Sequence, residues 1–189
     1  LNWLLTNFLG SIVLIVIILF QGDLRRALAQ MGAGHFWKKA QLSEGIVEEL
    51  AQAVMVLAKA KVGALIVIER YEPLGDVAER GVPLDAVITA SLLSTIFQVG
   101  TPLHDGAVII RRGRIAAAGC ILPLSSKLKA QSLFGTRHRA ALGISEESDS
   151  LSIVVSEARG TVSIAMSGRL TTSLNDQRLR RVIKNALER

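Results

Sequence analysis

Leu103-His104-Asp105-Gly106-Ala107-Val108-Ile109-Ile110 joins a polar corner to an apolar run. The run Ala107–Ile110 is short and apolar, which is typical of a buried strand. The acid and the imidazole directly before it therefore lie at the entrance of a strand, where side chains can reach a ligand. Two plainer interpretations compete with this one. Asp before Gly is a common turn composition, and an isolated His is more often structural than metal-binding.

A second polar cluster, Gly135-Thr136-Arg137-His138-Arg139, follows about thirty residues later. It places guanidinium groups, an imidazole and a hydroxyl at the predicted start of a helix, where backbone amides and the helix dipole also attract phosphate. A solvated basic turn that pairs with Glu146 and Glu147 is the alternative. Ser156-Glu157 is a third polar pair, directly after the apolar run 151–155, and open α/β sheets bind ligands at strand ends. Together these segments indicate a phosphate-containing ligand beside a carboxylate.

Helix and strand patterns alternate along residues 42–189. Apolar residues at helical spacing or capping residues predict helices over 43–61, 89–98 and 136–143, and a last one that Asn175 or Asp176 caps. Apolar or mostly apolar runs predict strands over 64–68, 107–110, 115–122, 151–155 and 161–166, and 169–172 is expected to be a further strand, with Gly160 and Gly168 in the turns. Segments 69–83 and 145–150 are polar and are predicted to be loops. The pattern favours an α/β domain with a mixed central β-sheet flanked by helices.

Residues 1–21 are predicted to form a transmembrane helix. From Phe8 to Phe20 only Gly10 and Ser11 are not apolar, and the run approaches the roughly 20 residues that a bilayer requires. No basic segment precedes it and no small-residue cleavage site follows it, which disfavours a signal peptide. A buried soluble helix is the alternative, but an uncharged, β-branched run suits lipid better. The sequence lacks an initiator Met, which indicates a fragment, so we expect further spans upstream of this helix.

The net charge of +6 bears on orientation and on partners. Basic residues dominate after the span: Arg25, Arg26, Lys38 and Lys39 against Asp23. They predict that the chain after the span is cytoplasmic, with a juxtamembrane helix and linker over 22–41 and a cytosolic domain over 42–189. A nucleic-acid partner is not expected, because the basic residues are scattered and aromatic residues make up only 4% of the chain.

Several common sites have no sequence signal. The sequence contains no P-loop, no nucleophile elbow and no Cys/His spacing typical of zinc. Gly32-Ala33-Gly34 lacks the preceding strand that a dinucleotide fingerprint needs. The single cysteine, Cys120, excludes an intrachain disulfide and is interpreted as a core residue in a reduced compartment.

The three polar segments closely resemble the diadenylate cyclase (DAC) family, whose hallmarks are an Asp-Gly-Ala and an Arg-His-Arg in this order. The similarity extends over Gly63-Ala64-Leu65, Leu122-Pro123-Leu124-Ser125, Gly143-Ile144-Ser145-Glu146 and Asp149-Ser150, and covers most of residues 43–172. The hydrophobic span with its short following helix resembles the membrane-anchored type, which normally carries three N-terminal spans.

The resemblance implies a DAC-domain fold and a reaction. Two ATP molecules condense to cyclic di-AMP with loss of two pyrophosphates, as each 3′-hydroxyl attacks the other nucleotide's α-phosphorus. Each domain holds one ATP, so a face-to-face homodimer is implied, together with Mg²⁺ or Mn²⁺. The implied location is the bacterial cell membrane, with the catalytic domain in the cytoplasm. A regulatory protein partner is also compatible with this type.

The resemblance also implies residue roles. Asp105 would activate the 3′-hydroxyl or hold the metal, and His104 would assist at the metal. The residues expected around ATP are Gly106 and Ala107 for close approach, Ile121 and Leu122 beside adenine, Thr136, Arg137 and His138 at phosphate, Arg139 supporting the loop, and Ser156 and Glu157 on the phosphate and metal side. Ile121 departs from relatives, which commonly have Tyr there, so stacking on the base would be lost.

Two other function classes remain open from the sequence. A membrane-tethered sensor would bind adenine nucleotides without turnover, but it would not need the base that Asp105 supplies. A basic nucleic-acid-binding domain would show affinity that falls steeply with salt. Both are ranked below the cyclase interpretation.

Overall fold

This computed structural model describes residues 12, 18, 44–128 and 134–188. The chain divides into two compact units, Leu1–Lys38 and Lys39–Arg189. Apart from the helical and exposed Ile12 and Ile18, the predicted transmembrane helix and the segment 22–41 lie outside the described residues. Among the residues that are described, no helix is long and apolar enough to cross a bilayer.

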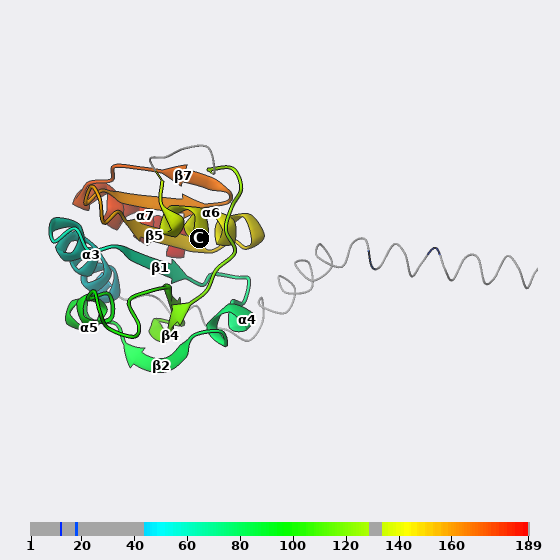
Figure 1. The fold of residues 1–189 in the computed structure, drawn as a ribbon, viewed down its shortest axis with the longest axis horizontal. Helices are drawn as coiled ribbons and strands as arrows, with labels where there is room; N and C mark the ends of the chain where they lie inside the picture. Colours follow the sequence, from blue (N-terminus) through cyan, green and yellow to red (C-terminus); the bar gives the residue numbers. More distant parts are fainter. Residues whose placement is uncertain (1–11, 13–17, 19–43, 129–133, 189) are drawn as a thin grey trace, which may run out of the picture. The chain divides into compact units, whose positions relative to one another are not determined.

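The second unit is built on a seven-stranded mixed sheet with the order β2-β4-β3-β1-β5-β6-β7 (Figure 1). The strands are β1 (Ala64–Ile68), β2 (Val82–Val87), β3 (Ala107–Arg111), β4 (Arg114–Cys120), β5 (Leu151–Val155), β6 (Val162–Met166) and β7 (Arg169–Thr171). Only β1 and β3 run parallel; the other neighbouring strands are antiparallel. The predicted mixed central sheet is confirmed.

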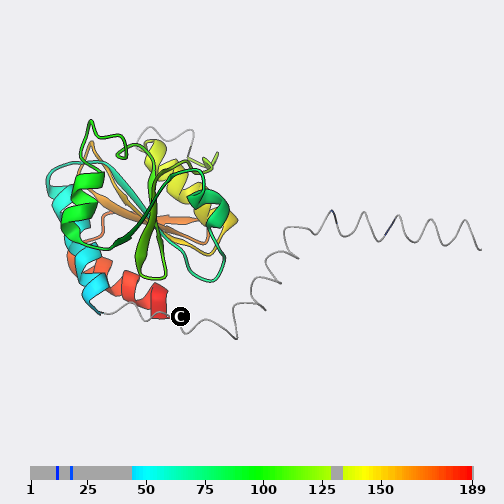
Figure 2. The ribbon, with the colours of Figure 1, turned by 90° about the horizontal axis from the view of Figure 1, so that it is seen from below.

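Helices cover both faces of the sheet (Figure 2). One face carries α3 (Glu44–Lys59), α5 (Ala90–Ile96) and α7 (Asp176–Glu188), and the other carries α4 (Gly75–Ala78) and α6 (Thr136–Glu147). Successive side chains of a strand point to opposite faces, so Ile66 and Ile68 of β1 pack with the first set while Leu65 and Val67 pack with the second. This explains why β1 is apolar throughout and buried at every residue.

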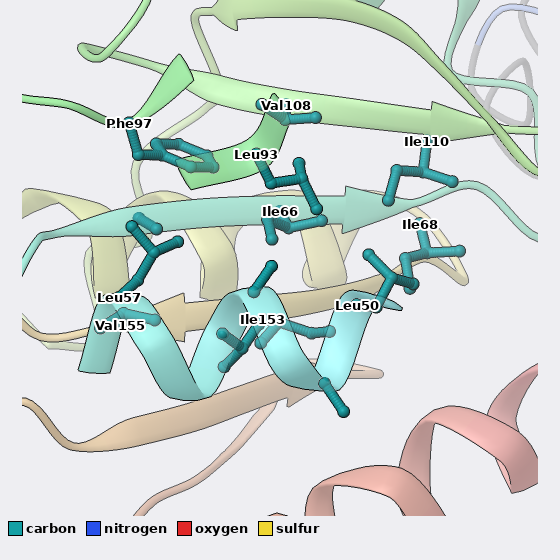
Figure 3. Packing of buried hydrophobic residues seen from close by; sticks show 14 of the residues in the cluster. Leu50, Leu57, Ile66, Ile68, Leu93, Phe97, Val108, Ile110, Ile153 and Val155 are labelled. Carbon is teal, nitrogen blue, oxygen red and sulfur yellow. The ribbon is translucent and has the colours of Figure 1, made fainter. Parts of the chain in front are cut away.

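The larger core lies between α3, α5 and the sheet (Figure 3). Leu50 and Leu57 of α3 and Phe97, which follows α5, are almost fully buried against the strands. Each such side chain stabilises the fold by about 1.5–3 kcal/mol relative to an exposed one. The start of α5 is fixed by the Thr89 hydroxyl, which accepts a hydrogen bond from the Leu92 amide at 3.2 Å.

Two predicted loops were wrong. Segment 69–83 contains α4 and the start of β2, an edge strand whose residues are mostly exposed. Strand β2 lacks a continuous apolar run because it packs on one side only. Pro83, which has no backbone N–H to donate, is tolerated in an edge strand. Helix α6 continues to Glu147, past the predicted end at Gly143. There the Ser145 hydroxyl donates to the Leu142 carbonyl at 2.8 Å, so residues that suggested an acidic loop belong to the helix.

Candidate active site

The predicted site residues gather at one edge of the sheet. Ala107 of β3 pairs with Cys120 of β4, so the Asp105 corner lies beside the end of β4. Ala64 of β1 pairs with Val155 of β5, which brings Ser156 beside the start of β1. Because β1 and β3 are parallel, both starts lie at the same edge. The ends of four neighbouring strands, β4, β3, β1 and β5, thus form a row. The row is about 14 Å across, because three strand spacings of about 4.8 Å separate its outer members.

The Asp105 side chain is exposed at this edge. Within the described residues it makes no hydrogen bond or ion pair, unlike Asp149, whose carboxylate accepts the amides of Tyr71 at 3.2 Å and Glu72 at 3.1 Å. A carboxylate without protein partners keeps its oxygens available for a metal ion or a hydroxyl proton. The Asp105 carboxylate is therefore free to bind a metal ion or to accept a proton.

Gly106 fixes the position of Asp105. Its φ of +124° is rarely adopted by residues with a side chain, and a Cβ there would lie 2.6 Å from the carbonyl carbon of Gly119. Gly119 itself has a φ of +66° and lies where the pairing of β3 and β4 shifts register. The two glycines let the backbone before β3 approach that of β4 closely, so the Asp105 carboxylate extends from a closely packed corner of the sheet.

His104 is oriented by the end of α5. Its Nδ1 lies 2.5 Å from the Thr101 carbonyl oxygen, which can only accept, so Nδ1 carries the proton. Thr101 is held in turn, since its hydroxyl lies 3.1 Å from the Ile96 carbonyl and 2.9 Å from that of Gln98. In the neutral imidazole with this tautomer, the lone pair lies on the other ring nitrogen, Nε2, which is then suited to bind a metal ion.

Arg137 and Glu157 form an ion pair across the far side of the row. Arg137 Nη1 lies 2.8 Å from Glu157 Oε2, and the two side chains are 21% and 68% exposed respectively. The Arg137 Nε is buried and has no hydrogen-bond partner within the described residues. The pair joins the first turn of α6 to the turn after β5, where Ser156 is buried.

His138 points into the protein and is only 3% exposed. Its Nε2 lies 3.5 Å from the Ser163 hydroxyl of β6, and its ring stacks at a tilt on Phe134 with centroids 5.3 Å apart. The Arg159 guanidinium lies 6.0 Å from the Phe134 ring centroid. Burial, and secondarily the charge of Arg159, lowers the pKa of His138. The side chains of His138 and Arg137 thus point to different places, and the contact of His138 with phosphate stays a prediction.

Arg139 contacts the loop that follows β4. Its Nε donates to the Ser125 carbonyl at 3.3 Å, and the Ser125 amide donates to the Arg139 carbonyl at 3.0 Å. The Ser125 hydroxyl also donates to Glu146 at 2.9 Å. These contacts give a physical basis for the supporting role expected of Arg139.

The end of the row where adenine is predicted to lie is apolar. Leu122 is 7% exposed and Ile121 is 71% exposed, so Leu122 is packed into the domain and Ile121 stands in solvent. Ala107 is fully buried at the start of β3.

The start of α6 is suited to an anion. Gly135 precedes the helix and has no side chain with which to cap it, and the first turn contains no acidic residue. The positive end of the dipole therefore has no acid of its own helix beside it. Thr136 is exposed there, next to Arg137.

The donor set fits a metal that is shared with a nucleotide. Within the described residues, no group of three or more His, Cys, Asp or Glu could hold an ion alone. Mg²⁺ bound with phosphates, however, usually takes only one or two carboxylates from the protein. Asp105 and the free Nε2 of His104 supply such a partial set.

Sequence reasoning missed the residues that hold the site in place. Thr101 and Phe134 lie close in the sequence to the histidines that they contact, but no motif marks them. Ser163 and Arg159 reach His138 and Phe134 only through the fold, so no local signal could have found these two.

Comparisons with known proteins identify relatives of this chain. The family model described as "DAC: DisA bacterial checkpoint controller nucleotide-binding" matches residues 51–170. The chain is 43% identical over 189 residues to the cyclic di-AMP synthase CdaA of Bacillus subtilis, covering 97% of this chain and 69% of that protein. It is 39% identical over 191 residues to a diadenylate cyclase of Listeria monocytogenes serotype 1/2a, covering 98% and 70%.

Two solved structures share the fold. A double mutant of DacA from Staphylococcus aureus matches with a TM-score of 0.74 at 40% identity, over 76% of this chain and 96% of that one. A hypothetical membrane spanning protein from Bacillus cereus matches with a TM-score of 0.66 at 40% identity, over 84% and 80%.

Proposed function

This chain belongs to the DAC family, and we propose from that premise that it is a diadenylate cyclase that condenses two ATP molecules into cyclic di-AMP. The observation that carries the proposal is the single sheet edge that bears a free carboxylate, an arginine and an apolar surface in one row. Such a row matches a nucleotide in order, with the base at one end and the phosphates at the other.

The reaction balances with groups at this edge. The 3′-oxygen of each nucleotide forms a bond to the α-phosphorus of the other, and the bond from that phosphorus to the bridging oxygen of pyrophosphate breaks. Two pyrophosphates leave, and each hydroxyl proton passes to a base. Little covalent chemistry falls to the protein, so positioning and charge stabilisation carry most of the catalysis.

Asp105 is proposed as the residue that accepts the hydroxyl proton or holds the metal. Its carboxylate has no competing protein partner within the described residues, and Gly106 fixes its backbone against β4. The atom of a base that accepts the proton must lie about 2.6–3.2 Å from the hydroxyl oxygen that loses it, and a closely packed corner can hold such a distance.

Thr136 and Arg137 are proposed to hold the phosphates at the start of α6. The exposed hydroxyl, the guanidinium and a helix dipole with no acid of its own helix beside it all favour an anion there. Glu157 keeps Arg137 in place from the other side through their 2.8 Å ion pair. His138 and Arg139 support this helix start from their buried and loop-facing positions.

Mg²⁺ or Mn²⁺ is proposed as the cofactor, held by Asp105 and by Nε2 of His104 together with the nucleotide. A bound divalent ion would neutralise charge on the phosphates. Thr101 fixes the His104 proton on Nδ1, and this leaves Nε2 ready for the ion without a change of tautomer.

A homodimer is proposed because the product contains two equivalent bonds. Each domain has one Asp105 corner for one nucleotide, so two copies must face each other to make both bonds. Turnover per protein should then fall on dilution, once the concentration drops below the dimer dissociation constant.

Membrane attachment through residues 1–21 is proposed from their hydrophobicity and from the likeness to a protein described as membrane spanning. The basic residues after the span favour a cytoplasmic catalytic domain, at the bacterial cell membrane. A regulatory protein partner would act on this same cytoplasmic side.

The test compares wild type with Asp105→Asn in product formation and in ATP binding. With Mn²⁺ and ATP, wild type should form cyclic di-AMP and D105N should lose at least about a hundredfold in rate, as is usual for a general base. Asp85→Asn is the control, because Asp85 is exposed on β2 and its side chain, among the residues that the structure describes, pairs only with the exposed Arg114 at 2.6 Å. It should keep wild-type turnover.

The sensor alternative predicts a different pattern. A sensor would bind ATP in both wild type and D105N and would form no product in either. ATP binding without product at any metal concentration would therefore replace the cyclase proposal by the sensor.

A further inference from the structure

Gly63 lies directly before β1, on the row between the Asp105 corner and Ser156. It is buried, and its φ is not in the left-handed range, so its backbone conformation is open to other residues. It also lies outside the pairing of β1 with β5, which begins at Ala64. Neither conformation nor strand pairing therefore explains a glycine at this position.

Space does explain it. A Cβ on Gly63 would lie 2.7 Å from Arg137 Nη1, 2.9 Å from Arg137 Cζ and 2.8 Å from Glu157 Oε2. These atoms are the two halves of the 2.8 Å ion pair, and they come from different elements, α6 and the turn after β5. The ion pair thus lies across the bare backbone of Gly63.

The clash would fall on side-chain ends and not on the backbone. Such ends can rotate away at small cost to the fold, in contrast to the backbone contact of Gly106. Rotation would nevertheless move the Arg137 guanidinium, since both its Cζ and its Nη1 lie within 3.0 Å of the added carbon. A methyl group at position 63 should therefore displace the guanidinium while the domain stays folded.

We propose that Gly63 is a positioning residue for the cyclase: its missing side chain lets Arg137 and Glu157 meet across the start of β1 and aims the guanidinium at the phosphates. The inference rests on the proposed function, because it takes Arg137 to hold phosphate. The start of β1 would then shape the part of the site that holds phosphate, together with α6 and the turn after β5.

Gly63→Ala tests the inference, with Gly75→Ala as the matched control. Gly75 also has a φ outside the left-handed range, and nothing lies within 4 Å of the position of its Cβ. Both variants should melt within a few degrees of wild type. G63A should raise the KM for ATP about tenfold, as expected for a lost hydrogen bond to a charged group, and G75A should not change it.

A double-mutant cycle separates positioning from a general structural effect. In Arg137→Ala the guanidinium is absent, so adding G63A should leave the ATP dissociation constant unchanged within about twofold. The dissociation constant is measured with a fluorescent ATP analogue, which does not require turnover.

The outcomes distinguish the two proposals. Wild-type KM in G63A, an unfolded G63A, or an equal loss of affinity in the R137A background would each overturn the role of Gly63. Absence of product from wild type would instead overturn the proposed cyclase function, and the binding cycle would still decide whether Gly63 aims Arg137 at a nucleotide.

Discussion

Replacing Gly106 with Ala should destabilise the fold, because two separate costs meet at this residue. The first is conformational: a φ of +124° is strained for alanine, which costs about 1–3 kcal/mol. The second is steric, since the new Cβ would lie 2.6 Å from the Gly119 carbonyl carbon and 2.8 Å from its Cα. Overpacking against a backbone that cannot rotate away costs about 1–3 kcal/mol more.

The sum is about 2–6 kcal/mol, a large part of the roughly 5–15 kcal/mol that stabilises a typical domain. For a domain of this size the melting temperature should fall by roughly 5–20 °C. Urea unfolding, followed by circular dichroism, gives the free energy directly. Activity should fall with stability, since Asp105 is carried by the same corner.

Gly100→Ala isolates the conformational cost. Gly100 has a φ of +89°, and nothing lies within 4 Å of the position of its Cβ, so only strain should remain. G106A should therefore be clearly less stable than G100A. Equal free energies of unfolding would refute the steric contact between the Asp105 corner and β4, and an unchanged G106A would refute both costs.

Three further substitutions address the site. His138→Gln should weaken the pH dependence of stability. Burial lowers the pKa of His138 in the folded protein below its usual value of about 6.5, so the unfolded chain binds the proton more readily. The free energy of unfolding of wild type therefore decreases as the pH falls below about 6.5. The loss between pH 7.5 and 5.5, from urea titrations, should be smaller in H138Q; an equal loss would contradict this. His104→Asn should keep a donor to the Thr101 carbonyl but raise the Mn²⁺ concentration for half-maximal activity about tenfold or more, and an unchanged metal titration would exclude His104 as a ligand. Ile121→Tyr should lower the KM for ATP about tenfold through stacking, because the exposed Ile121 leaves room for a ring, and an unchanged KM would place the base elsewhere.

The sequence predicts the buried strands well because burial on both faces leaves a continuous apolar run. The predicted range of β1 agrees residue by residue with the structure, and that of β5 does as well. Edge strand β2 is different, since one side faces solvent and its residues carry no such run. Its existence depends on β4, which pairs with it and lies far along the chain.

The sequence identifies the residues of the candidate site, but it does not predict the directions in which their side chains point. Consecutive residues of a helix point about 100° apart, so three neighbours cannot all face one phosphate. In the structure Arg137 meets Glu157, His138 turns into the core towards Ser163, and Arg139 reaches the loop at Ser125. The motif names all three, but only the packing of α6 on the sheet assigns their directions.

Gly63 illustrates the same limit. Its neighbours in the sequence identify it as the residue before a buried strand, and nothing local indicates a steric role. The need for a bare backbone arises only when α6 and the turn after β5 bring Arg137 and Glu157 to it.

The most direct test of the central claim is the stoichiometry of the products when the purified chain is incubated with ATP and Mn²⁺. Nucleotides are resolved by chromatography and identified by mass, and pyrophosphate is measured in the same samples. A diadenylate cyclase should release two pyrophosphates for each cyclic di-AMP at every time point. Hydrolysis to ADP or AMP, a linear dinucleotide with one pyrophosphate, or bound but unreacted ATP would contradict the assignment.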